Sequence, residues 1–258
     1  MILELTMRNI KVTIAYDGTN YHGFQEQRGT KLNTIQGVLE ECLSALAKKP
    51  VQVIGAGRTD AGVHAGGQVI NFMSDDWPVP VDRVTSALNS ILPRDIVTLS
   101  AEEVPANFHA RFSAVAKSYR YTIYNGKWHS PFMRLYSYHI PKLLDLPAMQ
   151  KAASNLLGKH DFSAFRALGT PVRTTVRKLY QIQLTRSADL IYIDLLAEGF
   201  LYHMARMISG TLIRVGLGKI TPDEVSDILA SRDSHRGGPA APARGLSLEK
   251  VYYPPALD

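Results

Sequence analysis

A regular alternation of side chains along residues 119–124 constrains the fold of this chain more than any other feature. Tyr119, Tyr121 and Ile123 alternate with Arg120, Thr122 and Tyr124, which is the two-residue period of a strand with one buried face. The pair Asn125-Gly126 follows directly and is typical of a hairpin turn, here leading into the strand-like run 135–140. We therefore expect β-structure in this part of the chain.

Strand-like and helical segments follow one another on both sides of this region. Before it, we expect strands at 11–16, 51–54, 68–72 and 96–99, and helices beginning after Thr34 and near Val84. After it, we expect paired strands at 176–184 and 190–196, a last strand at 246–253, and helices beginning near Asp145, Phe200 and Thr221. The similar order predicts two α/β subdomains, residues 1–108 and 109–258, with a junction near 105–115.

Capping residues and apolar stripes locate several helices. Thr34 and Asp145 are suited to cap helices, and Gly158 falls past the end of the second one. Residues 221–224, Thr-Pro-Asp-Glu, form a capping box. In the helix expected at 200–215 the apolar residues form one stripe, and Arg206 points away from it. The Gly- and Pro-rich segment 234–243 is expected to be a loop.

The loop 55–65, Gly-Ala-Gly-Arg-Thr-Asp-Ala-Gly-Val-His-Ala, is the best clue to function. Arg58 stands two residues before Asp60, so a guanidinium can keep a carboxylate ionised and orient it, while the glycines permit close approach of a ligand. This is typical of a nucleophilic aspartate, although a structural ion pair in a tight turn is an equally simple explanation. A dinucleotide fingerprint is excluded, because Asp60 occupies the position that requires Gly or Ala.

Composition narrows the class of protein. The chain has 258 residues, a formal net charge of +6 and a pI near 9.3, which favours a polyanionic partner such as nucleic acid, or else a generic basic surface. The single cysteine, Cys42, excludes an internal disulfide and a multi-cysteine zinc site, and its place on an apolar helix face predicts a core residue. Without a recognisable signal segment or membrane span, we expect a cytoplasmic protein.

Several motifs together resemble one family, the TruA family of tRNA pseudouridine synthases, over nearly the whole chain. The first half contributes Tyr16-Asp17-Gly18-Thr19-x-Tyr21-x-Gly23-Phe24-Gln25, the loop 57–64, the segment 108–114 and Lys117-x-Tyr119-Arg120-Tyr121. The second half contributes the segment 160–166 around His160-Asp161-Phe162, Phe200-x-x-His203-Met204-x-Arg206 and the segment 243–253. Phe24 departs from the family's usual tryptophan but preserves an aromatic ring.

The resemblance implies a fold and an activity. The fold is that of the pseudouridine synthases: two similar α/β subdomains with a mixed, largely antiparallel sheet, flanking helices and a central basic cleft. The activity is isomerisation of uridine to pseudouridine at positions 38, 39 and 40 in the anticodon stem-loop of tRNA. The enzyme is expected to be a homodimer. The reaction is redox-neutral and needs no group donor, so no cofactor is expected.

The resemblance also implies roles for individual residues. Asp60 is the nucleophile, Arg206 pairs with it, and Arg58 helps to hold the target nucleotide out of the stack. Tyr119 stacks on uracil and takes part in removing the proton from C5, and Leu246 forms an apolar wall of the uracil pocket. His64, His160 and His203 match no metal-binding spacing, so no metal is expected.

Two other classes of protein compete with this interpretation. An RNA-binding protein without catalytic activity would explain the basic charge, but it has no need of a carboxylate in a glycine loop, since that charge repels phosphate. A hydrolase of N-glycosidic bonds would also use a carboxylate, usually with a second acidic group to activate water, and Asp17 is a candidate for that group. Release of free uracil would identify the hydrolase.

Overall fold

The computed structural model describes residues 7–27, 29–167, 169 and 172–254, and these fall into two compact units. The first contains the described residues up to Val115 together with those from Leu248 onward, and the second is Ala116–Ser247. Each unit is described by itself below. None of the helices in the described part of the chain has the length and apolar character needed to cross a bilayer.

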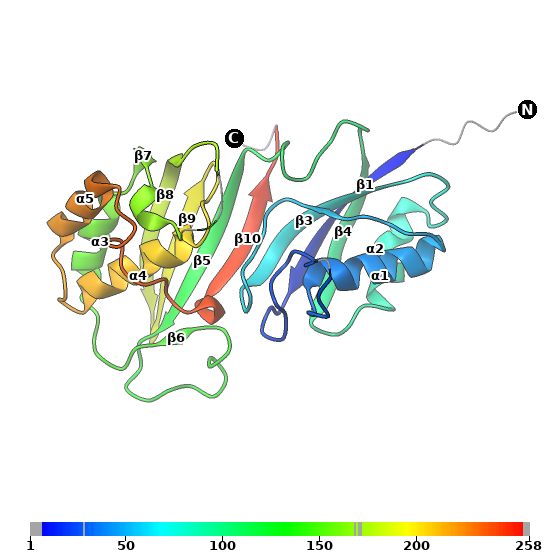
Figure 1. Ribbon diagram of the computed structural model, residues 1–258. Helices are drawn as coiled ribbons and strands as arrows, with labels where there is room; N and C mark the ends of the chain where they lie inside the picture. The colour runs from blue at the N-terminus through cyan, green and yellow to red at the C-terminus, as the bar shows by residue number, and fades with distance from the viewer. Residues whose placement is uncertain (1–6, 28, 168, 170–171, 255–258) are drawn as a thin grey trace, which may run out of the picture. The chain divides into compact units, whose positions relative to one another are not determined.

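The first unit is a sheet with helices on one face (Figure 1). Its strands lie in the order β4-β1-β3-β10, and β2 pairs with β3. Strand β1 pairs antiparallel with both β3 and β4, and its residues Ile10, Val12 and Ile14 are fully buried. The bounds are β1 Arg8–Tyr16, α1 Ile35–Ala47, β2 Ile54–Gly55, β3 His64–Ser74, α2 Val81–Asn89, β4 Ile96–Val104 and β10 Leu246–Tyr252.

Helix α1 begins as the sequence predicts. The side chain of Thr34 accepts a hydrogen bond from the amide of Gly37 and so satisfies one amide that the helix itself leaves without a partner. Cys42 lies half-buried on this helix, and burial raises the pKa of its thiol. The thiol therefore stays protonated, as a packing residue does.

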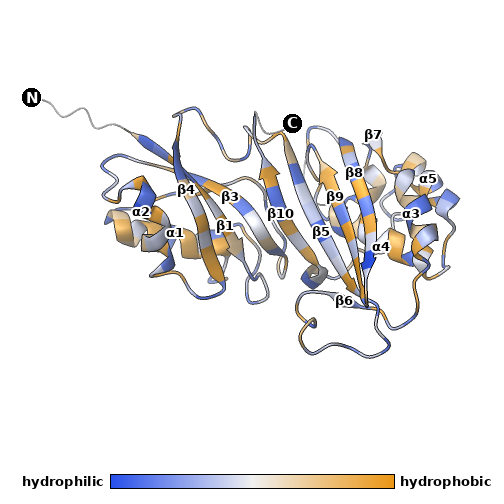
Figure 2. Cartoon of the chain, turned by 180° about the vertical axis from the view of Figure 1, so that it is seen from behind, coloured by the Kyte–Doolittle hydropathy of each residue, from blue (hydrophilic) through white to orange (hydrophobic). Residues whose placement is uncertain are grey.

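The second unit contains strands in the order β5-β9-β8-β7, with helices α3, α4 and α5 beside them (Figure 1). All neighbours in this order pair antiparallel. Figure 2 shows the strands from the opposite side, where hydrophilic and hydrophobic segments alternate along their length. The bounds are β5 Ala116–Tyr124, β6 Tyr138–His139, α3 Leu146–Ser154, β7 Gly158–Asp161, η1 Ser163–Phe165, β8 Val176–Ser187, β9 Leu190–Ala197, α4 Met204–Gly216, α5 Pro222–Ser231 and η2 Ala243–Gly245.

The mixed α/β fold with a largely antiparallel sheet is confirmed, but the prediction of a hairpin at Asn125-Gly126 is wrong. Strand β5 pairs antiparallel with β9, and the run after the turn contributes only the short β6, which lies parallel to β5. A tight hairpin turn of this type needs positive φ, and Gly126 does not adopt it. Asn125 is instead buried and donates hydrogen bonds to the carbonyls of Ile140 and Lys142, so it anchors a long loop.

Helix α4 is shorter and more buried than the sequence suggests. It begins at Met204 rather than Phe200, because His203 has φ 61° and cannot continue a right-handed helix. The predicted stripe is buried, but so are residues of the other face, including Ser209 and Thr211. The loop that follows α5 covers that other face: the hydroxyl of Thr211 donates to the carbonyl of Gly237.

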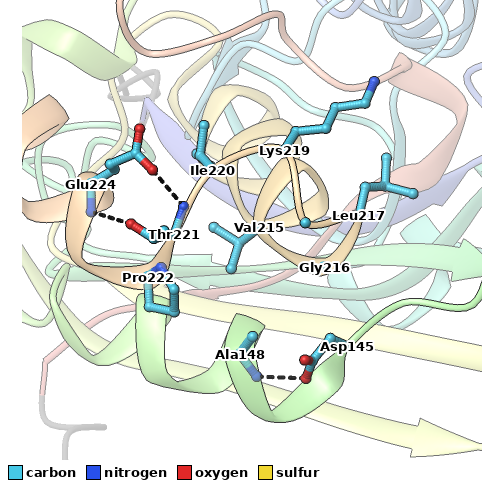
Figure 3. Close-up of a pocket in the computed structure, with 11 residues that line it drawn as sticks. Asp145, Ala148, Val215, Gly216, Leu217, Lys219, Ile220, Thr221, Pro222 and Glu224 are labelled. Atoms are coloured by element: carbon cyan, nitrogen blue, oxygen red, sulfur yellow. Dashed lines mark hydrogen bonds between the residues drawn. The ribbon is translucent and has the colours of Figure 1, made fainter.

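The starts of α3 and α5 carry the caps that the sequence predicts (Figure 3). Asp145 accepts from the amide of Ala148 at 2.9 Å, and Thr221 and Glu224 form both bonds of the capping box. A hollow of about 510 Å³ lies beside these helix starts and the loop between α4 and α5. None of the predicted site residues is among the described residues that line it.

Candidate functional site

Asp60 lies on the loop between β2 and β3 in the first unit. The side chain of Asp60 is partly accessible, whereas Thr59 before it is buried and Arg58 is exposed. The carbonyl of Asp60 accepts a hydrogen bond from the amide of Val63 at 3.1 Å, which closes a turn around Ala61 and Gly62. Gly62 has φ 76°, a conformation that side chains rarely allow, so glycine is needed here. The loop thus presents a carboxylate from a tight turn.

The segment 16–25 supports this loop from outside. The amide of Phe24 donates to the carbonyl of Thr59 at 3.0 Å. A Cβ on Gly18 would collide with the carbonyl of Val63, and one on Gly23 would come within 2.8 Å of the carbonyl of Thr59. Because Gly18 and Gly23 have no Cβ, the backbone of the segment 16–25 can contact the backbone of the loop at Val63 and at Thr59, on either side of Asp60.

His64 anchors the end of the same loop. It is buried, and its Nδ1 accepts a hydrogen bond from the amide of Gly18 at 3.1 Å. Among the residues that the structure describes, no group of three or more His, Cys, Asp or Glu side chains could hold a metal ion. Nδ1 of His64 also lies 3.1 Å from Oδ1 of Asp17, so His64 links the end of the loop to the segment 16–25.

Tyr119 lies on β5 in the second unit, at the strand position that the alternation predicts. Its side chain is buried, and the ring of Phe200 meets its ring edge-on, with centroids 4.8 Å apart. Such a contact fixes the plane of the tyrosine ring. Phe200 stands just before α4, so the contact ties β5 to the start of that helix.

Arg206 lies on the first turn of α4, half-buried and off the buried stripe. Its Nε donates to the carbonyl of Ala241 at 2.8 Å, and its Nη1 lies 3.3 Å from Nε2 of His203. The amide of Ala241 in turn donates to the carbonyl of Arg206 at 3.0 Å. The guanidinium is therefore held along one edge by the loop before η2, which fixes its direction.

Leu246 is buried and is the first residue of β10. The preceding Gly245 lies against the ring of Tyr121, and the hydroxyl of Tyr121 donates to the carbonyl of Pro242 at 2.9 Å. Burial raises the pKa of Tyr121, and the nearby charge of Arg206 opposes that rise. Tyr121 is thus a common neighbour of the segments that carry Tyr119, Arg206 and Leu246.

Sequence reasoning missed the residues that support the Asp60 loop from the sheet. Tyr16 and Gln68 are buried beneath it, and neither stands out on its own. Gln68 offers one signal, because a glutamine is rare within a run of buried strand residues such as Val69, Ile70 and Phe72. The hydrogen bonds of the Gln68 side chain in the folded structure show its role in supporting the loop.

Comparison with known proteins identifies the family. A family model described as "tRNA pseudouridine synthase" matches residues 12–113 and 152–254, which include Arg58, Asp60, Arg206 and Leu246. The chain belongs to the tRNA pseudouridine synthase family. The stretch between the two matched parts, residues 114–151, contains β5 with Tyr119, β6 and the start of α3.

Curated relatives of this synthase family member match along almost their whole length. "tRNA pseudouridine synthase A" of Acetivibrio thermocellus is 48% identical over 247 residues, which cover 96% of this chain and 100% of that protein. The protein of the same name from Moorella thermoacetica is 48% identical, covering 95% of this chain and 99% of that one. "tRNA pseudouridine synthase A 2" of Clostridium tetani is 44% identical, with 95% and 99% covered.

Proposed function

We propose that this chain converts uridine to pseudouridine at positions 38, 39 and 40 in the anticodon stem-loop of tRNA, with Asp60 as the nucleophile. Membership of the tRNA pseudouridine synthase family carries the proposal. The partly accessible carboxylate on a firmly held loop supports the assignment of the nucleophile. The positions in the stem-loop follow from the resemblance of the motifs to the TruA family.

The chemistry requires a group that can attack and then leave. In the net reaction the bond between C1′ and N1 of uracil breaks and a bond between C1′ and C5 forms. A proton leaves C5 and N1 gains one, so no electrons and no atoms are exchanged with another reagent. A carboxylate can form and release a covalent bond of this kind, which suits Asp60.

The two arginines have separate roles in the proposal. By the resemblance, Arg206 pairs with Asp60, and the carbonyl of Ala241 holds its guanidinium in one direction. Arg58 is exposed, so it can occupy the space that the target nucleotide vacates and contact phosphate. Unstacking a base costs about a few kcal/mol, which such contacts offset.

Tyr119 and Leu246 complete the proposed uracil site. The ring of Tyr119 stacks on the base, and its hydroxyl takes part in removing the proton from C5. Leu246 supplies an apolar wall. The edge-on contact with Phe200 supports this role for Tyr119, because the ring must hold one orientation while the base turns.

The partner is tRNA, and the enzyme is proposed to act as a homodimer in the cytoplasm without metal or cofactor. The formal net charge of +6 supports a polyanionic substrate. If binding is mainly to phosphates, the affinity for tRNA should fall at least about tenfold between 50 and 200 mM salt. Filter binding across this range tests it, and a flat response would contradict phosphate binding.

Substitution of the nucleophile tests the proposal most directly. Asp60→Asn should reduce pseudouridine formation at least about a thousandfold while leaving the affinity for tRNA nearly unchanged. The measurement is mass-spectrometric mapping of pseudouridine in a transcript with uridine at all three positions. Asp76→Asn is the control, because Asp76 is exposed in the same unit and asparagine tolerates its positive φ.

Other outcomes of this experiment would support the competing classes. Free uracil released by the wild-type protein would indicate a hydrolase, and tight binding without any product would indicate an RNA-binding protein. Asp17, the second acid that a hydrolase needs, already accepts hydrogen bonds from the amide and hydroxyl of Thr19 at 2.9 and 2.5 Å. The Oδ1 that accepts them also lies 3.1 Å from Nδ1 of His64, so Asp17 already has partners within the turn that it occupies.

A further inference from the structure

A chain of buried polar side chains runs beneath the Asp60 loop. The hydroxyls of Tyr16, at the end of β1, and Thr59, in the loop, are 2.8 Å apart. The side chain of Gln68, on β3, also hydrogen-bonds to Tyr16, and its Nε2 donates to the carbonyl of Gly57 at 2.8 Å. These three residues, which we call the Tyr16 network, are 4%, 6% and 0% exposed.

The network is costly to bury, so its presence needs an explanation. A buried hydroxyl or amide that loses its partner costs about 1–3 kcal/mol, and apolar side chains would fill the same space without that risk. Gln68 is fully buried on β3, directly before the apolar residues Val69 and Ile70. We therefore expect the polar residue to serve by orienting the atoms of the Asp60 loop to which it hydrogen-bonds.

The bonds of the network end on both sides of Arg58, directly before Asp60. Gln68 holds the carbonyl of Gly57, and Tyr16 holds the side chain of Thr59. The amide of Phe24 holds the carbonyl of Thr59 from the opposite side. The peptide that precedes Asp60 is thus fixed by two strands and a neighbouring loop, although it belongs to no regular element itself.

Tyr16 takes part in the network as a neutral hydrogen-bonding group. Burial raises the pKa of its phenol well above the ordinary value, despite the hydrogen bonds to Thr59 and Gln68 that oppose the rise. The phenol stays neutral throughout the working range of pH. Its contribution is therefore geometric.

We propose that Tyr16, Thr59 and Gln68 are positioning residues that hold Asp60 in the orientation needed for attack on the extruded nucleotide. This inference rests on the proposed function of Asp60. When a nucleophilic carboxylate is displaced by about 1 Å, its attack on the substrate becomes much slower, even though the substrate still binds. The Tyr16 network therefore acts on the rate of the chemical step and not on the affinity for tRNA.

Removal of single hydroxyl groups tests the proposal. Thr59→Val keeps the shape of the side chain and deletes its hydroxyl, Thr59→Ser keeps the hydroxyl, and Tyr16→Phe removes the other partner. Single-turnover pseudouridine formation with saturating enzyme gives the rate of the chemical step. Tyr253→Phe is the matched control, since it deletes another buried hydroxyl of the first unit, which donates to the carbonyl of Ala110.

We expect Thr59→Val and Tyr16→Phe to slow the chemical step at least about tenfold, with the dissociation constant for tRNA within about twofold of wild type. Thr59→Ser should recover most of the rate. The double variant Tyr16→Phe, Thr59→Val should be no slower than the slower single variant, because both changes break the same hydrogen bond, the one between the hydroxyls of Tyr16 and Thr59. Tyr253→Phe should lower the melting temperature without slowing the chemical step.

Two results would overturn the inference. The first is a wild-type rate of the chemical step in both Thr59→Val and Tyr16→Phe. The second is a decrease in rate that is proportional to the decrease in melting temperature across all variants, Tyr253→Phe included, with the rates measured well below each melting temperature. Both are distinct from failure of the proposed function, in which the wild-type protein itself would form no pseudouridine. Because the rates come from folded enzyme at low temperature, a lowered stability does not conceal the answer.

Discussion

The Asp60 loop and the start of α4 fix charged side chains by opposite means. The loop has no ladder of backbone hydrogen bonds, and it is held by polar side chains buried beneath it, Tyr16 and Gln68 among them. Arg206 instead stands on a helix that is buried on nearly all sides by apolar contacts, and one carbonyl, that of Ala241, orients its guanidinium. Hydrogen bonds at chosen atoms hold the loop in place, whereas packing holds the helix and a hydrogen bond then directs the side chain that it carries.

This comparison predicts that conservative changes of Arg206 affect activity much more than stability. Arg206→Lys removes the Nε–H that donates to Ala241 and replaces a planar fork by a mobile ammonium. We expect pseudouridine formation to fall about ten- to a hundredfold, with a melting temperature close to wild type. Arg232→Lys, at the exposed end of α5, serves as the control. Unchanged turnover in Arg206→Lys would show that its orientation is unimportant.

The burial of α4 should be visible in stability. Ile208 is fully buried on this helix, so Ile208→Ala should lower the free energy of unfolding by about 2–5 kcal/mol through lost burial and the cavity left behind. Urea denaturation measures it. Ile91→Ala, at a position that is 43% exposed, should cost much less. If both variants were equally stable, apolar burial would not be what holds α4.

The smallest effect is expected at the start of α5. Thr221→Ala removes the capping box and should cost about 1 kcal/mol, with pseudouridine formation unchanged. Thr221→Ser should retain the cap. A loss of activity in Thr221→Ala would mean that the second unit is coupled to catalysis more broadly than the positions of Tyr119 and Arg206 suggest.

The capping box also predicts a dependence on pH. Hydrogen bonds from the amide and hydroxyl of Thr221 lower the pKa of Glu224. A carboxyl group whose pKa is lowered in the folded state stabilises the fold above its ordinary pKa, and the contribution is lost as pH falls through the folded value. The difference in melting temperature between wild type and Thr221→Ala should therefore narrow on acidification below about pH 4.

Much of the local structure could be predicted from the sequence, because local physics decides it. The caps at Thr34, Asp145 and Thr221 satisfy helix amides a few residues away, and strand β9 buries every second residue, which is the period of two. The prediction of a hairpin at Asn125 was wrong because the turn preference of the Asn-Gly pair competes with contacts to residues further along the chain. The buried side chain of Asn125 bonds to carbonyls about 15 residues further along the chain, and no local pattern reports that.

For the candidate site, the sequence by itself determined which residues we propose to carry the chemistry, since Arg58, Asp60, Tyr119, Arg206 and Leu246 all stand in recognisable motifs. Only the tertiary structure decided what holds them. Tyr16, Thr59 and Gln68 come from three separate segments, and Arg206 is oriented by a carbonyl 35 residues away. The reason is physical: a hydrogen bond depends on distance and direction in space, and folding alone brings such distant groups within reach.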